Sequence, residues 1–242
     1  VVALAVVTGS VYEDRNGNGV RDPGEPPYVN QPVTITDSTG AVQTVQTDQN
    51  GDYRADVAPG PATLDVQPPP GVRLTTANDP QTINVAASPT PTPSPPVGYQ
   101  ALGGVSGSVW FDIGSANRQR DGGDQPLAGW IVELIDPALP PGSAPVRTTT
   151  TDSTGSYVFT DVPASNYLIQ FRDPSSQVVY GTPVNGEQGN AQPGSQPAPG
   201  NERGQLQVTI SAGQTLPQQS LPVDPSGVVY DAVSRDLIPG AI

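Results

Sequence analysis

Residues 6–25 read VVTGSVYEDRNGNGVRDPGE, and this stretch decides what kind of fold the chain adopts. Its first part is rich in β-branched residues, which favour a strand. Its second part, residues 14–25, places oxygen ligands at loop positions one, three, five, nine and twelve, with a glycine at position six. A calcium ion needs several oxygen ligands of this kind, together with a backbone carbonyl at position seven and a two-oxygen Glu at position twelve. Since no helix pattern precedes the loop, the sequence predicts a calcium loop carried on β-structure.

Six residues of this loop are the predicted calcium ligands. They are Asp14, Asn16, Asn18, Val20 (through its backbone carbonyl), Asp22 and Glu25. The competing interpretation is a polar turn without an ion, because Asn, Asp and Gly favour turns by themselves. The complete ligand spacing favours calcium, and its mounting on strands indicates a rigid extracellular module rather than a calcium sensor.

The composition excludes several classes of protein and site. The chain of 242 residues has a net charge of −13, which argues against nucleic-acid binding because a phosphate backbone requires a basic surface. It contains no Cys, His, Met or Lys, which excludes disulfides and the common zinc and copper sites. No apolar run is long enough to cross a membrane. The absence of Met predicts that the chain was processed or cut from something longer.

Short apolar runs between turn residues predict an all-β fold. The 30 Pro and 27 Gly residues supply the turns, while Val, Ile and Leu recur in short alternating runs. We expect Trp110 and Trp130 to pack in cores rather than to form a sugar-stacking platform. The same expectation holds for Tyr12, Tyr99, Tyr157 and Tyr167. We expect no enzyme, because no pair of carboxylates stands out and neither His nor Lys is present to assist one.

Three segments of the chain align with one another. Residues 7–14, 105–112 and 225–231 share Gly-x-Val-aromatic ahead of an Asp. A second motif, T-D-x-x-G-x-Y, occurs at residues 47–53 and again at residues 151–157. In its first copy the Asn50–Gly51 pair predicts a tight hairpin turn, and we interpret Asp48, Asn50 and Asp52 as hairpin residues rather than as ligands of a second ion. A period of about one hundred residues exceeds that of solenoid repeats and indicates whole domains in tandem.

These repeats divide the chain into two predicted domains and two partial units. The boundaries are 1–6 for the end of a preceding repeat or an edge strand, 7–101 for the first sandwich, 102–223 for the second, and 224–242 for the opening strands of a following repeat. The Pro-rich segment 87–96 either joins two strands of the first domain, which we favour, or spaces the domains. Residues 181–204 form a long loop, which is either a mobile insertion or a functional surface.

The motifs resemble those of the SdrD B-like and Cna-B-type repeats of bacterial surface proteins. The resemblance rests on G-x-V-aromatic-x-D, on the D-x-N-x-N-G-x-x-D-x-G-E loop, on L-A-G-W at residues 127–130 and on T-D-x-x-G-x-Y. It covers nearly the whole chain and implies prealbumin-like (Ig-like) β-sandwiches in the stalks of adhesins and large secreted proteins. Related domains often carry an internal Lys–Asn isopeptide bond, which cannot form here because Lys is absent.

The second repeat departs from the calcium loop of the family. Residues 112–124 have lost the regular ligand spacing and have gained two Arg residues. Asp112, Asp121 and Asp124 are the remaining candidate calcium ligands. The other interpretation is a solvated loop without an ion.

Three functions are consistent with these features. The leading hypothesis is a structural module of a bacterial cell-surface or secreted fibrous protein, stiffened by calcium and joined end to end to neighbouring repeats or subunits. The second is an adhesin that contacts a host or surface ligand through residues 181–204 or an exposed sheet edge. The third is a fibre protomer that donates its terminal strands, residues 1–7 and 227–242, to neighbouring subunits. Deletion of residues 181–204 would impair only the adhesin, and only the fibre protomer would polymerise when purified.

Overall fold

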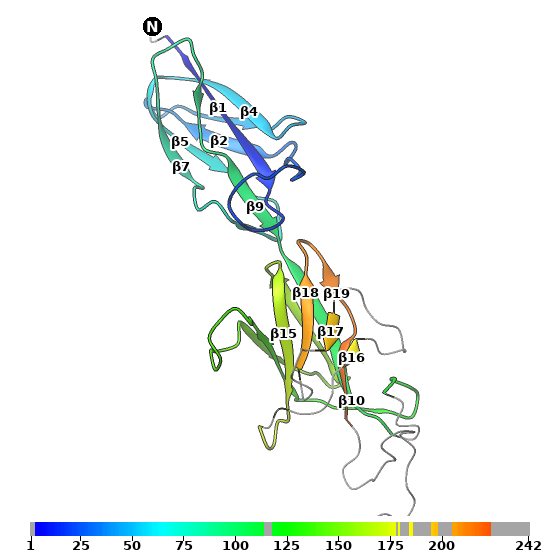
Figure 1. The fold of residues 1–242 in the computed structure, drawn as a ribbon. Coiled ribbons are helices and arrows are strands. Elements are labelled where there is room, and N and C mark those ends of the chain that lie inside the picture. Colours follow the sequence, from blue (N-terminus) through cyan, green and yellow to red (C-terminus); the bar gives the residue numbers. More distant parts are fainter. Residues whose placement is uncertain are drawn as a thin grey trace, which may run out of the picture. The chain divides into compact units, whose positions relative to one another are not determined.

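The structure is a computed structural model that describes residues 3–113, 118–177, 179, 184–185, 195–197 and 205–223. These residues form strands and turns without a helix, which confirms the predicted all-β class. Within them there is accordingly no helix long and apolar enough to span a membrane. The chain divides into two compact units, unit 1 (Val1–Leu102) and unit 2 (Gly103–Ile242), and each is described by itself (Figure 1).

Unit 1 consists of two sheets that enclose one hydrophobic core. The first sheet has the strand order β4-β1-β9-β6, with β8 also paired to β1, and the second has the order β3-β2-β5-β7. The strands are β1 (Ala5–Glu13), β2 (Pro32–Thr36), β3 (Val42–Gln46), β4 (Asp52–Val57), β5 (Gly60–Val66), β6 (Val72–Leu74), β7 (Gln81–Val85), β8 (Thr92–Pro93) and β9 (Val97–Ala101).

Strand β1 lies inside its sheet because it hydrogen-bonds to strands on both sides. It pairs antiparallel with β4 and parallel with both β8 and β9, so that Val11 lies opposite Val97 and Glu13 lies opposite Tyr99. Val7 and Val11 of β1 are fully buried against the second sheet. Burying a side chain of this size stabilises the fold by roughly 1.5–3 kcal/mol. The stretch quoted first from the sequence is therefore the central strand of unit 1 and the loop that follows it.

Unit 2 repeats this topology. Its first sheet has the order β11-β10-β20-β16, with β14 and β19 also paired to β10, and its second has the order β13-β12-β15-β18-β17. As in unit 1, the opening strand β10 pairs parallel with the last strand that the structure describes in the unit, β20. The strands are β10 (Gly103–Phe111), β11 (Gln125–Pro126), β12 (Ile131–Ile135), β13 (Arg147–Thr150), β14 (Ser156–Val162), β15 (Ser165–Arg172), β16 (Val184–Asn185), β17 (Ser195–Pro197), β18 (Gln205–Ile210), β19 (Thr215–Leu216) and β20 (Gln219–Val223).

The aromatic residues pack in the interior of the two units, as predicted. Trp110 is 0% exposed and Trp130 is 5% exposed, so neither offers a platform to a sugar. The four tyrosines expected to be buried, at positions 12, 99, 157 and 167, are buried as well.

A tyrosine reaches across the opening strand of each unit to the segment that closes the sandwich. In unit 1, Tyr53 of β4 lies opposite Gly9 of β1, and its hydroxyl is 2.8 Å from the hydroxyl of Ser94. A Cβ atom at Gly9 would overlap both hydroxyls, so the crossing requires glycine there. In unit 2, Tyr157 makes the corresponding crossing and donates to the carbonyl of Gln219. The crossing joins β4 to the segment just ahead of β9 in unit 1, and it joins β14 to the start of β20 in unit 2.

The Asn50–Gly51 turn does not close a hairpin, and that part of the sequence prediction is wrong. It connects β3 to β4, which belong to different sheets. One carboxylate oxygen of Asp48 accepts the amide hydrogens of Asn50 and Asp52 at 2.8 and 3.0 Å, so this side chain holds the turn. The buried hydroxyl of Thr47 bonds to the backbone ahead of β2, which fixes the end of β3 and lets the chain change sheets. Gly51 alone in this turn has a left-handed φ, of 79°.

Some predicted segments lie partly or wholly outside the described residues. Residues 181–204 are not one continuous loop as predicted, because the structure describes β16 and β17 within them, which pair with β20 and β18. Residues 224–242, predicted as opening strands of a following repeat, and residues 1–2 lie outside the described residues. Residues 5–7, which the fibre hypothesis assigned to a donated strand, belong to β1 and pair with β4 inside unit 1, so that part of the hypothesis is wrong. The adhesin hypothesis and the donation of residues 227–242 stay predictions. The Pro-rich segment 87–96 lies within unit 1, between β7 and β9.

Replacing Tyr53 with Phe should lower the free energy of unfolding of unit 1 by about 1 kcal/mol, because a buried hydrogen bond to Ser94 is lost. Denaturant unfolding followed by circular dichroism measures this change. Tryptophan fluorescence is the control, since Trp110 and Trp130 both lie in unit 2 and their transition should not move. Adding Ser94→Ala to the Tyr53→Phe chain should recover part of the loss; no loss in the single variant would contradict the role of the crossing.

Candidate metal centre

Asp14 begins the loop after β1 and is fully buried. Its Oδ1 accepts the amide hydrogens of Gly17 at 2.7 Å and Asn18 at 3.2 Å, and its Oδ2 accepts that of Gly19 at 2.7 Å. Burial acts to raise the pKa of the Asp14 carboxyl, but hydrogen bonds from the Thr75 side chain and from these three amides outweigh it and lower the pKa below the ordinary 3.8. The carboxylate is therefore held in its charged form at the base of the loop.

Asn16 and Asn18 converge on Asp22. The Nδ2 atom of each donates to Oδ2 of Asp22 at 2.8 Å. Their own oxygens accept backbone amide hydrogens, that of Asn18 at 3.0 Å for Asn16 and that of Val20 at 2.7 Å for Asn18. The structure thus brings together three of the predicted ligand side chains at one oxygen atom.

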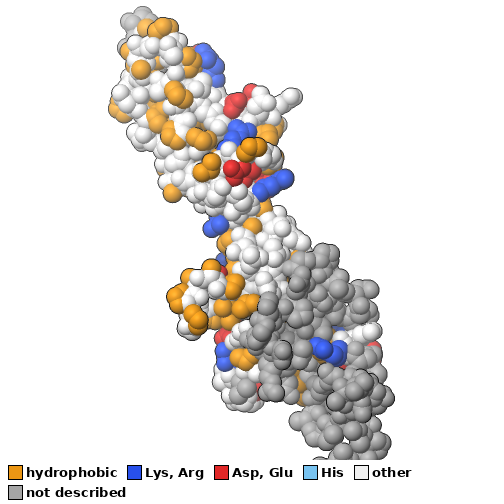
Figure 2. All heavy atoms as spheres, in the orientation of Figure 1, with side chains coloured by type: hydrophobic (Ala, Val, Ile, Leu, Met, Phe, Trp, Pro, Cys, Tyr) orange, Lys and Arg blue, Asp and Glu red, His pale blue; other side chains and the backbone are white. Residues whose placement is uncertain are grey.

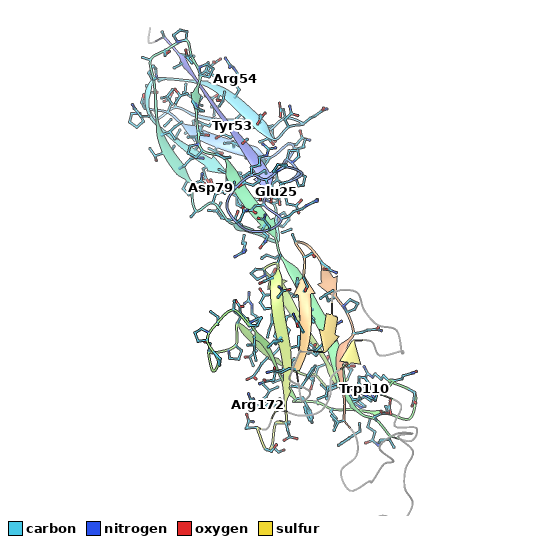
Figure 3. The ribbon with its side chains drawn as sticks, in the orientation of Figure 1. Glu25, Tyr53, Arg54, Asp79, Trp110 and Arg172 are labelled. Atoms are coloured by element: carbon cyan, nitrogen blue, oxygen red, sulfur yellow. The ribbon has the colours of Figure 1, made fainter. Side chains whose placement is uncertain are left out.

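Glu25 closes the loop at its far end. Its two carboxylate oxygens accept the amide hydrogens of Arg15 at 2.9 Å and Asp22 at 3.0 Å. Glu25 lies beside the end of β1, where the loop returns to the sheet (Figure 3). Because one carboxylate spans the start and the end of the loop, it fixes the distance between them.

The donor set of this loop fits a hard cation. Its side-chain donors are three carboxylates and two carboxamides, and oxygen donors of this kind suit calcium. Among the described residues no three His, Cys, Asp or Glu side chains gather as a metal site, so the fit depends on the amide oxygens as well as the carboxylates. Rotating the two carboxamides by half a turn exchanges nitrogen for oxygen in nearly the same position. Asn16 and Asn18 would then present oxygens beside Asp22, where they now present Nδ2.

Arg21 connects the loop to the turn between β3 and β4, a contact that was not expected from the sequence. Its guanidinium donates to the carbonyl of Asn50 at 3.0 Å and lies 5.8 Å from the ring centroid of Tyr12. Acidic and basic side chains accordingly lie close together on the surface of unit 1 (Figure 2). The signal in the sequence was an Arg directly before the Asp at loop position nine, which recurs as Arg120 before Asp121.

Tyr12 lies fully buried beside the loop. Burial, followed by the charges of Asp14 and Glu25, raises the pKa of its phenol to about 12. Its hydroxyl oxygen is buried without a hydrogen-bond partner among the described residues. The phenol therefore stays neutral and does not add to the negative charge of the loop.

The loop of unit 2 is closed by the same kind of contact, a carboxylate that accepts two backbone amide hydrogens, although its ligand spacing differs. We call this contact the clasp. The carboxylate of Asp124 accepts the amide hydrogens of Ile113 at 2.9 Å and Asp121 at 2.8 Å, as Glu25 does in unit 1. The buried Asp112 accepts the amide hydrogen of Arg118 at 2.6 Å. Arg120 donates to the carbonyl of Thr154 at 2.8 Å and so repeats the contact of Arg21. Residues 114–117, which complete this loop, lie outside the described residues.

Comparison with known proteins places these loops in a family context. The profile of the SdrD B-like domain matches residues 5–92 and 103–218. Serine-aspartate repeat-containing protein F of Staphylococcus epidermidis is 31% identical over 177 residues, which cover 68% of this chain and 10% of that protein. Colossin-A of Dictyostelium discoideum is 30% identical over 195 residues, which cover 72% of this chain and 2% of that protein.

Two solved structures are among those that match this chain, both at low sequence identity. The Bacillus anthracis TIE protein has a TM-score of 0.37 at 12% identity, with 92% of this chain and 34% of that chain covered. A streptococcal ancillary pilin has a TM-score of 0.37 at 10% identity, with 90% of this chain and 62% of that chain covered.

Acid should destabilise unit 1 partly through Asp14. Because the folded-state pKa of Asp14 lies below its ordinary 3.8, its contribution is fully present above about pH 4 and is lost as the pH falls through the folded-state value. With a chelator present, Asp14→Asn should lower the melting temperature of unit 1 at neutral pH and make it less sensitive to pH below 4. Asp37 is the internal control. Hydrogen bonds from Thr39 hold the pKa of its carboxyl at about 2, so its contribution to the loss of stability in acid should persist in the Asp14→Asn variant. An unchanged acid response in Asp14→Asn would contradict the assignment.

Proposed function

The chain belongs to the SdrD B-like domain family, and from this premise we propose that its two units are spacer domains that transmit force, with calcium stiffening unit 1. The family confirms the resemblance inferred from the motifs and places the chain among repeat domains of cell-surface proteins, outside the cell. The chain spans a tenth or less of the length of the relatives described above. The partners and ligands of the whole protein are therefore part of the proposal, and we propose a structural role, not a catalytic one.

The observation that supports calcium is the convergence of Asn16 and Asn18 on one oxygen of Asp22. Around that point Asp14 and Glu25 are already fixed by backbone amides, so accepting an ion requires rotation of the Asn16 and Asn18 carboxamides but no movement of the two carboxylates that anchor the loop. A site that is formed in advance loses less conformational entropy when its ligand binds.

Asp14, Asn16, Asn18, the carbonyl of Val20, Asp22 and Glu25 would hold the ion. When bound, calcium would supply a double positive charge that offsets the repulsion between three neighbouring carboxylates. Hydrogen bonds connect the loop to β9, the strand that pairs with β1. The Asp14 amide donates to the carbonyl of Tyr99 in β9 at 2.9 Å, and the side chain of Gln100 donates to the carbonyl of Arg15 at 3.1 Å. Fixing the loop therefore fixes β1 against β9.

The pairing of β1 with β9 suits a domain that is pulled through its ends. Force along the chain enters unit 1 through the start of β1 and leaves through the end of β9. Since these two strands are parallel neighbours, such force slides one along the other and loads their hydrogen bonds together rather than one at a time. Strands β10 and β20 repeat this arrangement in unit 2.

The expected contribution of calcium is large compared with the stability of a single domain. At free calcium one hundred times Kd, binding adds about 2.7 kcal/mol to the free energy of unfolding. A typical domain has a net stability of only about 5–15 kcal/mol. An ion at the loop would thus supply a substantial fraction of the resistance of unit 1 to unfolding.

Chelation of calcium should lower the melting temperature of unit 1 more than that of unit 2. Calorimetry of the full chain follows both units, and tryptophan fluorescence follows unit 2 alone because Trp110 and Trp130 both lie there. Glu25→Gln should remove the calcium response of unit 1, because it weakens the ligand that closes the loop.

The matched control is Asp124→Asn, which alters the corresponding clasp in unit 2 and should leave the calcium response of unit 1 intact. Equal and negligible shifts in both units on chelation would refute the proposal of a calcium-stiffened spacer.

A further inference from the structure

Two Asn–Gly steps lie inside the candidate metal loop, Asn16–Gly17 and Asn18–Gly19, and a third, Asn50–Gly51, lies in the turn before β4. An Asn followed by Gly is prone to cyclise, because glycine has no Cβ to shield the backbone nitrogen that attacks the side chain. In this reaction the Gly nitrogen loses its proton and forms a bond to Cγ of the Asn, whose amide nitrogen leaves as ammonia. Water then opens the resulting succinimide ring to aspartate or isoaspartate.

The closed loop opposes this reaction at Asn16. The nitrogen that would attack, that of Gly17, donates its hydrogen to the buried carboxylate of Asp14 at 2.7 Å. The carboxamide that would be attacked is held at both atoms, by Asp22 at 2.8 Å and by the amide of Asn18 at 3.0 Å. Ring closure requires these three hydrogen bonds to break.

Asn18 is held in the same way. The nitrogen of Gly19 donates to Asp14 at 2.7 Å, while the carboxamide of Asn18 bonds to Asp22 at 2.8 Å and to the amide of Val20 at 2.7 Å. The two sites therefore open together, since Asp14 and Asp22 hold both of them.

Asn50 offers a built-in reference. It is exposed, and no described residue hydrogen-bonds to its carboxamide. The nitrogen of Gly51 donates to the carbonyl of Asp48 at 3.0 Å, a contact within the turn that does not involve the loop ligands. The loop reaches Asn50 at its backbone carbonyl, through Arg21, and not at the two groups that would react.

We propose that Asn16 and Asn18 are sites of spontaneous deamidation, which the closed loop suppresses and the open loop permits. The inference rests on the proposed function insofar as calcium keeps the loop closed. With the ion bound, the carboxamide oxygens of Asn16 and Asn18 would be held by calcium in place of the bonds from their nitrogens to Asp22. The bonds from the Gly17 and Gly19 nitrogens to Asp14 serve the loop with or without the ion. Deamidation to aspartate adds a negative charge at each position, next to Asp14, Asp22 and Glu25. Deamidation to isoaspartate lengthens the backbone and breaks the spacing of the ligands. The extent of deamidation in the loop of unit 1 therefore increases with the time that the loop has spent open.

Peptide mapping by mass spectrometry tests this in the full chain. Cleavage after Arg15 and Arg21 releases residues 16–21, NGNGVR, which carry both sites. The chain is incubated with calcium chloride or with EDTA, and calcium binding to the fresh chain is measured in parallel by calorimetry. In EDTA the loop peptide should deamidate; calcium at one hundred times Kd should slow this about a hundredfold, because the open state is depleted by that factor. Deamidation at Asn50 should proceed equally in both solutions.

The two failures are distinguishable. If calorimetry shows binding but NGNGVR deamidates equally fast with calcium and with EDTA, the inference is overturned and the proposed function stands. If calorimetry shows no binding, the proposed function is overturned. The inference is then tested without metal, by measuring deamidation of the Asp22→Ala chain in EDTA. Removing the acceptor of both carboxamides should speed deamidation of the loop peptide about tenfold or more relative to Asn50. An unchanged ratio in Asp22→Ala would overturn the inference.

Discussion

The parallel pairing of the opening strand with the closing strand is the constraint on which the rest of each unit depends. In unit 1 it places β9 beside β1, so that the loop after Glu13 begins against the last strand of the sandwich. The opposite edge of β1 carries β4, and the turn ahead of β4 receives the side chain of Arg21 from the same loop. One loop thus contacts the beginning, the middle and the end of the unit.

The two repeats differ in their loops, and the contacts that both loops share are those that the fold requires. Glu25 and Asp124 each close a loop by accepting backbone amide hydrogens, and Arg21 and Arg120 each tie a loop to the neighbouring turn. These contacts need no ion, because carboxylate and guanidinium groups satisfy backbone groups directly. The carboxamide oxygens of Asn16 and Asn18 also accept backbone amide hydrogens, but the nitrogens of both side chains meet at one oxygen of Asp22. Their presence in unit 1 is therefore the feature that points to a ligand.

The loop of unit 1 is satisfied by its own hydrogen bonds, and this has two consequences. Backbone amides and carboxamides already surround its carboxylates, so the chain tolerates three neighbouring acidic groups in a protein whose net charge is −13. The same bonds immobilise the Asn–Gly steps, which are chemically fragile in a flexible chain. Mechanical order and chemical durability then have a common origin, because both are lost when the contacts to Asp14 and Asp22 break.

Local features of the sequence determined much of this protein, because they follow from residue type and spacing alone. The strand period, the turn residues and the repeated G-x-V-aromatic-x-D motif indicated tandem all-β units, and the spacing from Asp14 to Glu25 indicated the candidate loop. Contacts between distant segments were decided only by the tertiary structure. The turn at Asn50–Gly51 joins two sheets rather than a hairpin because the buried Thr47 bonds to the segment ahead of β2, which no local pattern reveals. The link from Arg21 to Asn50 and the contact of Tyr53 with Ser94 likewise exist because the sheet brings together residues 29 and 41 positions apart.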